Sequence, residues 1–147
     1  MDAQTLIDRL GLRPHPEGGH FVETWRAPAG PDGARAAGST ILYLLAAGER
    51  SHWHRVDAAE VWHYAAGAPL ELRMWAEDQT TVSTIRVGDA ERDGATPHGV
   101  VPAGWWQAAR SLGAWTLVGC IVMPAFDFAG FELAPPGWEP PGWEPPG

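Results

Sequence analysis

The residue types that can do chemistry are concentrated in one segment of the chain, residues 51–66, which reads SHWHRVDAAEVWHYAA. Its polar members include His52, His54, Glu60 and His63. His52 and His54 are two positions apart, so on an extended strand their side chains lie on the same face. Two imidazoles and a carboxylate that converge can hold a metal ion or act as general acid and base. An HxH pair can equally be two ordinary strand residues with satisfied hydrogen bonds, so the rest of the chain has to decide.

The composition favours one acidic domain with a hydrophobic core. The chain has 147 residues, of which 45% are hydrophobic and 19% charged, and its net charge is −8 with His neutral. This charge argues against nucleic acid and against anionic membrane surfaces as partners. The single cysteine, Cys120, excludes an internal disulfide, and its apolar neighbours predict a buried, unreactive thiol. With no signal peptide and no apolar run of about 20 residues, we expect a cytoplasmic protein.

The elements that must position the polar residues are mainly short strands. Residues 3–10 can form an amphipathic helix between an Asp2 cap and Gly11, and PHPEGG at 14–19 is typical of a fixed turn. After it, short apolar or alternating runs are separated by Gly and Pro. These runs predict strands at 20–26, 39–45, 52–55, 61–65, 69–75, 80–87, 99–101, 105–110 and 115–123. Many short strands at regular spacing predict an all-β sandwich or barrel.

The last residues have a different composition. Residues 135–147 read PPGWEPPGWEPPG, in which a unit of five residues is repeated. Proline at this density favours extended structure and blocks sheet pairing. We therefore assign residues 1–134 to one domain and residues 135–147 to a tail. The tail is either solvated or docked on a neighbouring surface through Trp138 or Trp143.

Two motifs, in this order, resemble the signatures of the cupin superfamily. The first has H-x-H, then Glu, then Gly, and is matched by His52, His54, Glu60 and Gly67. The gap between His54 and Glu60 is one or two residues longer than the general pattern. The second motif has P-x-G and a later His; Pro102 and Gly104 match, but Gln107 stands at the ligand position.

The wider resemblance is to a small single-domain cupin family whose function is largely unassigned. It covers roughly residues 4–140, and the segments that carry it are PHPEGG, STILYLL, HRVDAAEVWHYAAG, VPAGWWQAA, LVGC and FDFAGFELAPPGWEP. In that family Gln is usual at the position of Gln107. The resemblance implies an all-β double-stranded β-helix, the cupin jelly-roll barrel, with a pocket at one end. By analogy it also implies a homodimer.

For the site we predict four converging side chains that could hold a metal: His52, His54, Glu60 and Gln107. His54 and Glu60 are the candidate catalytic residues. Alternation along the strands adds aromatic walls, and the PHPEGG turn adds a carboxylate, which gives a ligand pocket that includes Trp62, Tyr64, Trp105 and Glu17. His15 can border this pocket, whereas His63 is out of phase with Glu60. We expect His20 and His98 to lie on the surface.

The metal, if one is bound, is expected to be held weakly. A glutamine amide oxygen is a poorer donor than the imidazole it replaces, and Glu60 would be the only anionic ligand. Such a site favours zinc, iron or manganese and releases the ion to chelators and at low pH, where imidazoles are protonated.

Three functions remain open from the sequence. The first is an isomerase or epimerase that acts on a small carbonyl compound or sugar, with His54 or Glu60 moving a proton. The second is a metal-dependent oxygenase, for which two His and a carboxylate are the usual iron ligands. The third is a cupin that binds a small molecule without turnover.

Overall fold

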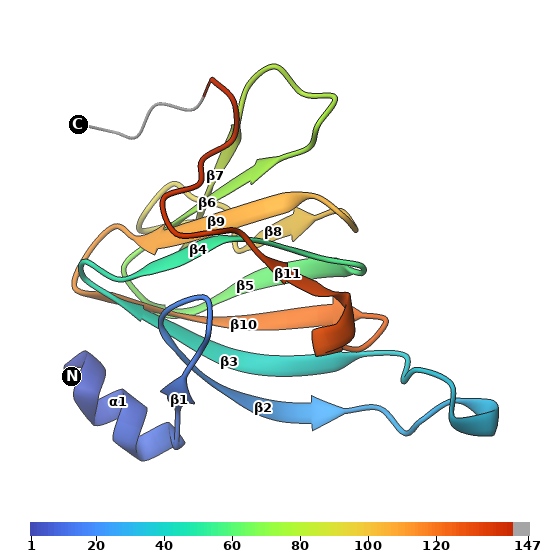
Figure 1. The fold of residues 1–147 in the computed structure, drawn as a ribbon. Coiled ribbons are helices and arrows are strands. Elements are labelled where there is room, and N and C mark those ends of the chain that lie inside the picture. Colours follow the sequence, from blue (N-terminus) through green and yellow to red (C-terminus); the bar gives the residue numbers. More distant parts are fainter. Residues whose placement is uncertain (143–147) are drawn as a thin grey trace.

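The computed structural model describes residues 1–142 of the chain. These residues contain eleven strands and one α-helix (Figure 1). Sheet A has the order β1 (Arg13–Pro14), β2 (His20–Arg26), β3 (Ser39–Ala46), β10 (Trp115–Met123), β5 (Ala59–Gly67) and β8 (His98–Val101). Sheet B has the order β11 (Phe131–Leu133), β4 (Arg50–Val56), β9 (Trp106–Ser111), β6 (Leu70–Trp75) and β7 (Ser83–Val87). All the pairings between these strands are antiparallel. The predicted all-β architecture is confirmed.

The helix is also where the sequence predicts it. Helix α1 spans Ala3–Leu10, the Asp2 side chain accepts a hydrogen bond from the Thr5 N–H at 2.8 Å, and Gly11 ends the helix with φ 68°. The apolar side of α1 packs on the outside of sheet A, against Leu12, Leu44 and Leu117. Within residues 1–142, no helix is long and apolar enough to cross a membrane.

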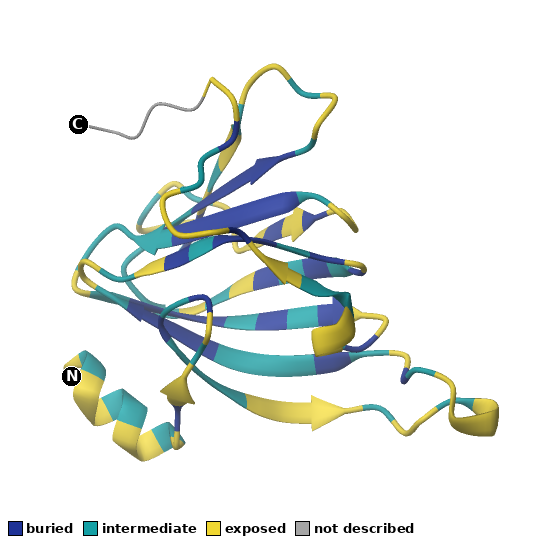
Figure 2. Ribbon diagram, in the orientation of Figure 1, coloured by how far each residue is buried: buried dark blue, intermediate teal, exposed yellow. Residues whose placement is uncertain are grey.

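The core fills the space between the two sheets, where the strands are buried on their inner faces (Figure 2). Its fully buried members come from both sheets and include Tyr43, Trp62, Leu70, Leu72 and Val118. Because successive side chains on a strand point to opposite faces, each strand gives the core every second residue. A closed interior of this kind leaves polar residues inside it only where they have partners.

Two strands have no counterpart among the predicted ones. The short β1 lies in the turn region after α1, and β11 follows the proline and phenylalanine segment that leaves β10. The run predicted as a strand at 80–87 becomes extended only from Ser83, since β7 spans Ser83–Val87. Of these differences, strand β11 bears most on the predicted site, because it pairs with β4 and places Leu133 opposite His54.

The repeated tail is docked at its first unit. The Trp138 ring packs against an aromatic cluster formed by Trp53, Trp75 and Trp106 on the outside of sheet B. The sequence left open whether the tail is solvated or docked, and the structure shows that Trp138 is docked. Trp143 lies outside the described residues.

The PHPEGG turn is held in place by contacts with two strands. The Tyr43 hydroxyl on β3 donates to the Gly18 carbonyl, and the His52 N–H on β4 donates to the Glu17 carbonyl at 2.7 Å. Gly18 has φ 111°, and a Cβ atom at this position would meet the carbonyl oxygen of Arg50. The turn can therefore approach β4 this closely only with glycine, and the approach carries the Glu17 side chain into the barrel.

We expect Gly18→Ala to destabilise the protein much more than Gly48→Ala. Gly48 has φ 80° with open space around its Cβ position, so alanine there meets only the backbone penalty of about 1 kcal/mol. Gly18→Ala adds a clash with backbone and should cost at least about 3 kcal/mol, as severe packing defects do. Urea denaturation of the two variants measures both values. Equal losses would show that the turn does not need the close approach.

Candidate acid/base site

A cavity of about 160 Å³ lies between the two sheets. Its walls are mostly apolar and are formed by Phe21, Ile41, Val56, Val122, Phe126, Phe128 and Phe131. Its inner end carries five polar or titratable side chains, which are His15, Glu17, His54, Glu60 and Cys120. Glu23, Arg26 and Ser39 complete the lining. The cavity therefore combines an aromatic wall with a small group of buried acids and bases.

His54 is the centre of the polar group. It lies on β4, only 2% exposed, with its Nδ1 atom 2.7 Å from Glu17 Oε2 and 2.7 Å from the carbonyl oxygen of His52. A carbonyl oxygen only accepts hydrogen bonds, so Nδ1 carries a proton. Burial by itself would lower the pKa of His54, but the adjacent Glu17 carboxylate outweighs burial and raises it to about 8. His54 is therefore predominantly an imidazolium at neutral pH.

Glu17 is the counter-ion of this imidazolium. Burial would raise the pKa of Glu17, but its attraction to His54 outweighs burial and holds the pKa below the ordinary value. His15 Nδ1 lies 3.5 Å from the other carboxylate oxygen, but it accepts a hydrogen bond from the Glu17 N–H at 3.1 Å. That nitrogen therefore carries no proton, and burial lowers the pKa of His15. The ion pair of the site is Glu17 with His54.

The pKa of Glu60, on β5, is shifted in the opposite direction from that of Glu17. Burial raises the pKa of Glu60 to about 7, opposed by the nearby His54 imidazolium and reinforced by the Glu17 carboxylate. Its Oε1 accepts one hydrogen bond from Gln107 Nε2 at 2.9 Å. Cys120 on β10 lines the same cavity, and burial together with Glu60 raises the pKa of its thiol well above the ordinary value. Cys120 is buried and un-ionised, in line with the sequence-based prediction.

Gln107 on β9 fixes the orientation of Glu60. The Trp62 indole N–H donates to Gln107 Oε1 at 2.7 Å. Because an indole N–H can only donate, the amide oxygen faces Trp62 and the amide NH₂ faces Glu60. The oxygen that was predicted to reach a metal is thus already bound to Trp62.

His52 does not join the other predicted ligands. The ladder between β4 and β9 shifts register between Ser51 and His54, so the simple alternation that would align the two imidazoles fails there. The His52 ring instead faces the C-terminal segment, where Nε2 lies 3.0 Å from the carbonyl oxygen of Pro135. The structure brings His54, Glu60 and Gln107 together and leaves His52 outside.

The donors present do not fit a metal centre of the predicted kind. Of the four predicted ligands, only His54 and Glu60 line the cavity. His54 offers only its Nε2 atom, since Nδ1 is engaged by Glu17, and the Gln107 oxygen is engaged by Trp62. Across residues 1–142, no three His, Cys, Asp or Glu side chains are arranged to hold a metal ion.

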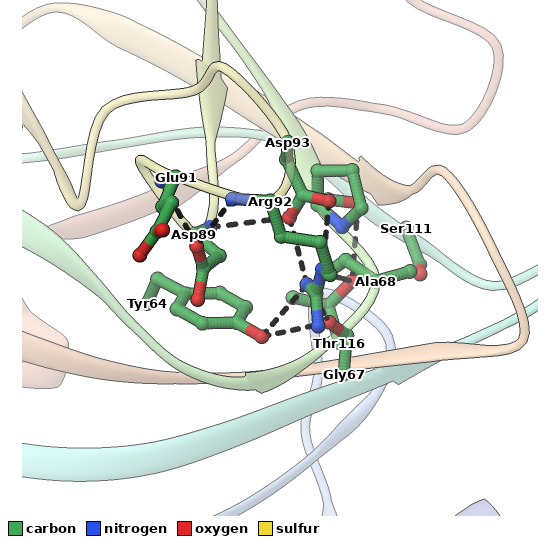
Figure 3. A network of polar contacts seen from close by, with 10 residues as sticks. Tyr64, Gly67, Ala68, Asp89, Glu91, Arg92, Asp93, Ser111 and Thr116 are labelled. Carbon is green, nitrogen blue, oxygen red and sulfur yellow. Dashed lines mark hydrogen bonds and ion pairs between the residues drawn. The ribbon is translucent and has the colours of Figure 1, made fainter.

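Three aromatic residues predicted to line the pocket are placed elsewhere. Trp62 is 1% exposed in the hydrophobic core, beyond Gln107, and Trp105 packs on the same core. Tyr64 lies in another polar network, where its hydroxyl donates to the Gly67 carbonyl at 2.8 Å and accepts from Arg92 Nη2 at 3.0 Å (Figure 3). Strand alternation indicates which face a side chain takes, but not how far along the barrel it lies.

The residues that the sequence reasoning missed are the phenylalanines of the wall. Phe126 and Phe128 come from the segment between β10 and β11, Phe131 is the first residue of β11, and Phe21 comes from β2. The one available signal was the FDFAGF run, in which three aromatic residues fall within six positions. The turn residue Glu17 was predicted to border the pocket and does line it, with His15 beside it.

The remaining histidines lie away from the cavity. His63 and His98 face each other across β5 and β8 on the surface, with their Nδ1 atoms 2.9 Å apart. The Nδ1 atom of His20 lies 3.8 Å from Glu49 Oε2.

Comparison with known proteins identifies relatives over nearly the whole chain. Residues 4–134 match the family model described as "Cupin superfamily (DUF985)". None of the curated proteins matches. A solved structure of the Shewanella oneidensis protein SO0799 is 34% identical with TM-score 0.84, covering 91% of this chain and 85% of that one. A hypothetical protein from Leishmania major is 32% identical with TM-score 0.79, covering 90% and 86%.

More distant structures share the fold alone. One is a Bacillus subtilis oxalate decarboxylase mutant, 13% identical with TM-score 0.62, of which the match covers 30% and of this chain 84%. An uncharacterised Klebsiella pneumoniae protein with a double-stranded β-helix domain is 16% identical with TM-score 0.56, covering 88% of this chain and 94% of that one. The predicted double-stranded β-helix is thereby confirmed.

We expect Glu17→Gln to lower the pKa of His54 by more than about one unit, because the neutral amide no longer offsets burial of the imidazolium. The His54 ring titration, followed by NMR, measures the change. Glu77→Gln, at an exposed carboxylate, is the matched control and should leave the titration unchanged. An unaltered His54 pKa in Glu17→Gln would mean that a group other than Glu17 stabilises the positive charge on the His54 ring.

We expect Glu60→Gln to stabilise the folded protein at alkaline pH. The folded-state pKa of Glu60 is about 7, against the ordinary 4.5 of a glutamate, so the wild type loses stability as pH rises from 4.5 to 7. Above that window the buried carboxylate costs on the order of 3 kcal/mol, which the amide avoids. Urea denaturation at pH 8 should show this gain. The gain should shrink toward zero near pH 4.5, and an advantage that is independent of pH would contradict the assignment.

Proposed function

The chain belongs to the DUF985 family of the cupin superfamily, and from that premise we propose that it binds a small carbonyl compound and moves a proton beside the carbonyl, as isomerases and epimerases do. The observation that carries this proposal is the pair His54 and Glu60. Both are buried in one cavity, with a pKa of about 8 for His54 and about 7 for Glu60. Paired titratable groups whose environments tune them toward neutral pH are characteristic of acid/base catalysts.

Glu60 is the group suited to take the proton from carbon. With a pKa near 7, its carboxylate is a stronger base than that of an ordinary glutamate, and about half of it is ionised at neutral pH. Its orientation is fixed by the Gln107 amide, which donates to one carboxylate oxygen. After abstraction Glu60 is a neutral acid, and it returns the proton to the same carbon or to its neighbour.

His54 is the group suited to stabilise the developing enolate. Its imidazolium is held by Glu17 at Nδ1, so Nε2–H is the donor left for a substrate oxygen. A preorganised cation in a water-poor site stabilises negative charge more effectively than it would in water. Glu17 does not touch the substrate in this scheme; it keeps His54 charged and oriented.

The cavity supports a small, largely apolar substrate. A volume of about 160 Å³ limits the ligand to a few ring or chain atoms. Phe21, Phe126, Phe128 and Phe131 provide flat apolar contact area, whereas the inner end offers the acid and the base. A small carbonyl compound with one apolar side places its polar end at His54 and Glu60.

We expect the protein to catalyse exchange of carbon-bound hydrogen with D₂O in a subset of small ketones and hydroxycarbonyl compounds. Proton NMR of a panel of branched and cyclic carbonyl compounds measures the exchange. The rate should rise as pH increases through about 7, where Glu60 ionises, and fall above about 8, where His54 becomes neutral.

Glu60→Gln should reduce exchange at least about 100-fold while ligand binding persists, and Glu77→Gln should behave as wild type. Compounds that bind in the cavity without exchange at any pH would identify a binding protein without turnover instead.

A further inference from the structure

The outside of sheet B carries a site built around Trp138. Three nearly buried indoles, those of Trp53, Trp75 and Trp106, surround it, and we refer to these three as the tryptophan cradle. The Trp138 ring centroid lies 6.2 Å from Trp53, 6.2 Å from Trp75 and 4.7 Å from Trp106. Aromatic rings at these separations attract each other beyond the burial of their surface.

The carboxylate of Glu139, the residue after Trp138, is bound at the same site. Trp53 Nε1–H donates to Glu139 Oε2 at 2.7 Å, and Arg50 lies 3.6 Å from the other oxygen of this carboxylate. The site therefore takes an indole and the carboxylate that follows it in sequence. The peptide enters along β4, where the Ala134 N–H donates to the Trp53 carbonyl at 2.9 Å.

A turn presents the indole to the tryptophan cradle. The Trp138 N–H donates to the Pro135 carbonyl at 3.0 Å, and Gly137 has φ 80°. Proline followed by glycine at positive φ is the sequence pattern of a type II turn. The next unit begins with the same residues, and Gly142 has φ 76°. The two units thus share their sequence, PPGWE, and the conformation of their turn glycine.

We propose that the tryptophan cradle is a binding site for a Pro-Pro-Gly-Trp-Glu segment, and that the second unit of this chain, residues 140–144, is an alternative occupant of it. Every group that the site recognises in the first unit is present in the second: the indole of Trp143 and the carboxylate of Glu144. Arg50 and the Trp53 N–H would receive Glu144 as they receive Glu139. Only the position of the unit along the chain differs.

The exchange requires one loop in the chain. When the second unit occupies the cradle, the first unit becomes a loop of five residues between Ala134 and Pro140. Loops of two to six residues are common connections, and closing one adds only a modest entropic cost. The first unit is favoured because it needs no such loop.

Three variants of the full chain test the proposal: Trp138→Ala, Trp143→Ala and the double variant. We expect Trp143→Ala to leave the melting temperature unchanged, because the first unit fills the site. Trp138→Ala should lower the melting temperature slightly, because Trp143 replaces the lost ring. The double variant should lower it by at least about 5 °C more, since no indole remains for the cradle.

Equal losses in Trp138→Ala and the double variant would overturn the proposal, because Trp143 would then contribute nothing. A loss in Trp143→Ala alone would overturn it as well, since the second unit would then have a site of its own. No loss in any variant would show that the cradle does not depend on the indole.

A second measurement does not require the double variant to fold. Incorporation of 5-fluorotryptophan into the full chain gives a ¹⁹F signal for each indole. In Trp138→Ala, the Trp143 signal should move toward the shift that Trp138 has in the wild type. A Trp143 signal that stays at its wild-type shift would overturn the proposal.

Synthetic Ac-PPGWE-NH₂, added to the double variant Trp138→Ala/Trp143→Ala, should raise the melting temperature of that variant, whereas Ac-PPGAE-NH₂ should not.

Discussion

The buried ion pair between Glu17 and His54 is the interaction on which the site depends. A carboxylate and an imidazole at 2.7 Å inside a barrel are stable as charges only because each offsets the desolvation of the other. The pair joins two parts of the chain that are far apart in sequence, the turn before β2 and the middle of β4. The close approach at Gly18 and the Tyr43 hydrogen bond serve to bring this carboxylate to the imidazole.

A second carboxylate next to the same imidazole acquires different properties. Glu17 is committed to His54, so Glu60 is left with a neutral amide as its hydrogen-bond donor and with burial as the dominant effect on its pKa. Two glutamates in one cavity therefore have pKa values shifted in opposite directions. In this chain Gln107 orients the Glu60 carboxyl group, and its own amide oxygen is held by Trp62. The cavity thus places titratable groups behind an aromatic wall.

Much of the fold could be predicted from the sequence, and the site only in part. Period-two alternation and turn residues indicated the strands, and the motif resemblance indicated the barrel and the convergence of His54 and Glu60 inside it. Alternation does not report depth along a barrel, so Tyr64 was placed in the pocket although it contacts Arg92 elsewhere. A register shift has no signature in the residues around Ser51, which is why His52 was misplaced. Phe131 escaped notice because β11 has only three residues.

The position of β11 in the chain bears on how the protein is made. Phe131 closes the cavity beside His54, and β11 is held by its pairing with β4. A ribosome completes Glu17, His54 and Glu60 long before it completes this strand, and domains emerge from the N-terminus first. Until β11 is released, the cavity lacks the part of its wall that Phe131 provides. The closed wall around His54 is thus a property of the nearly finished polypeptide.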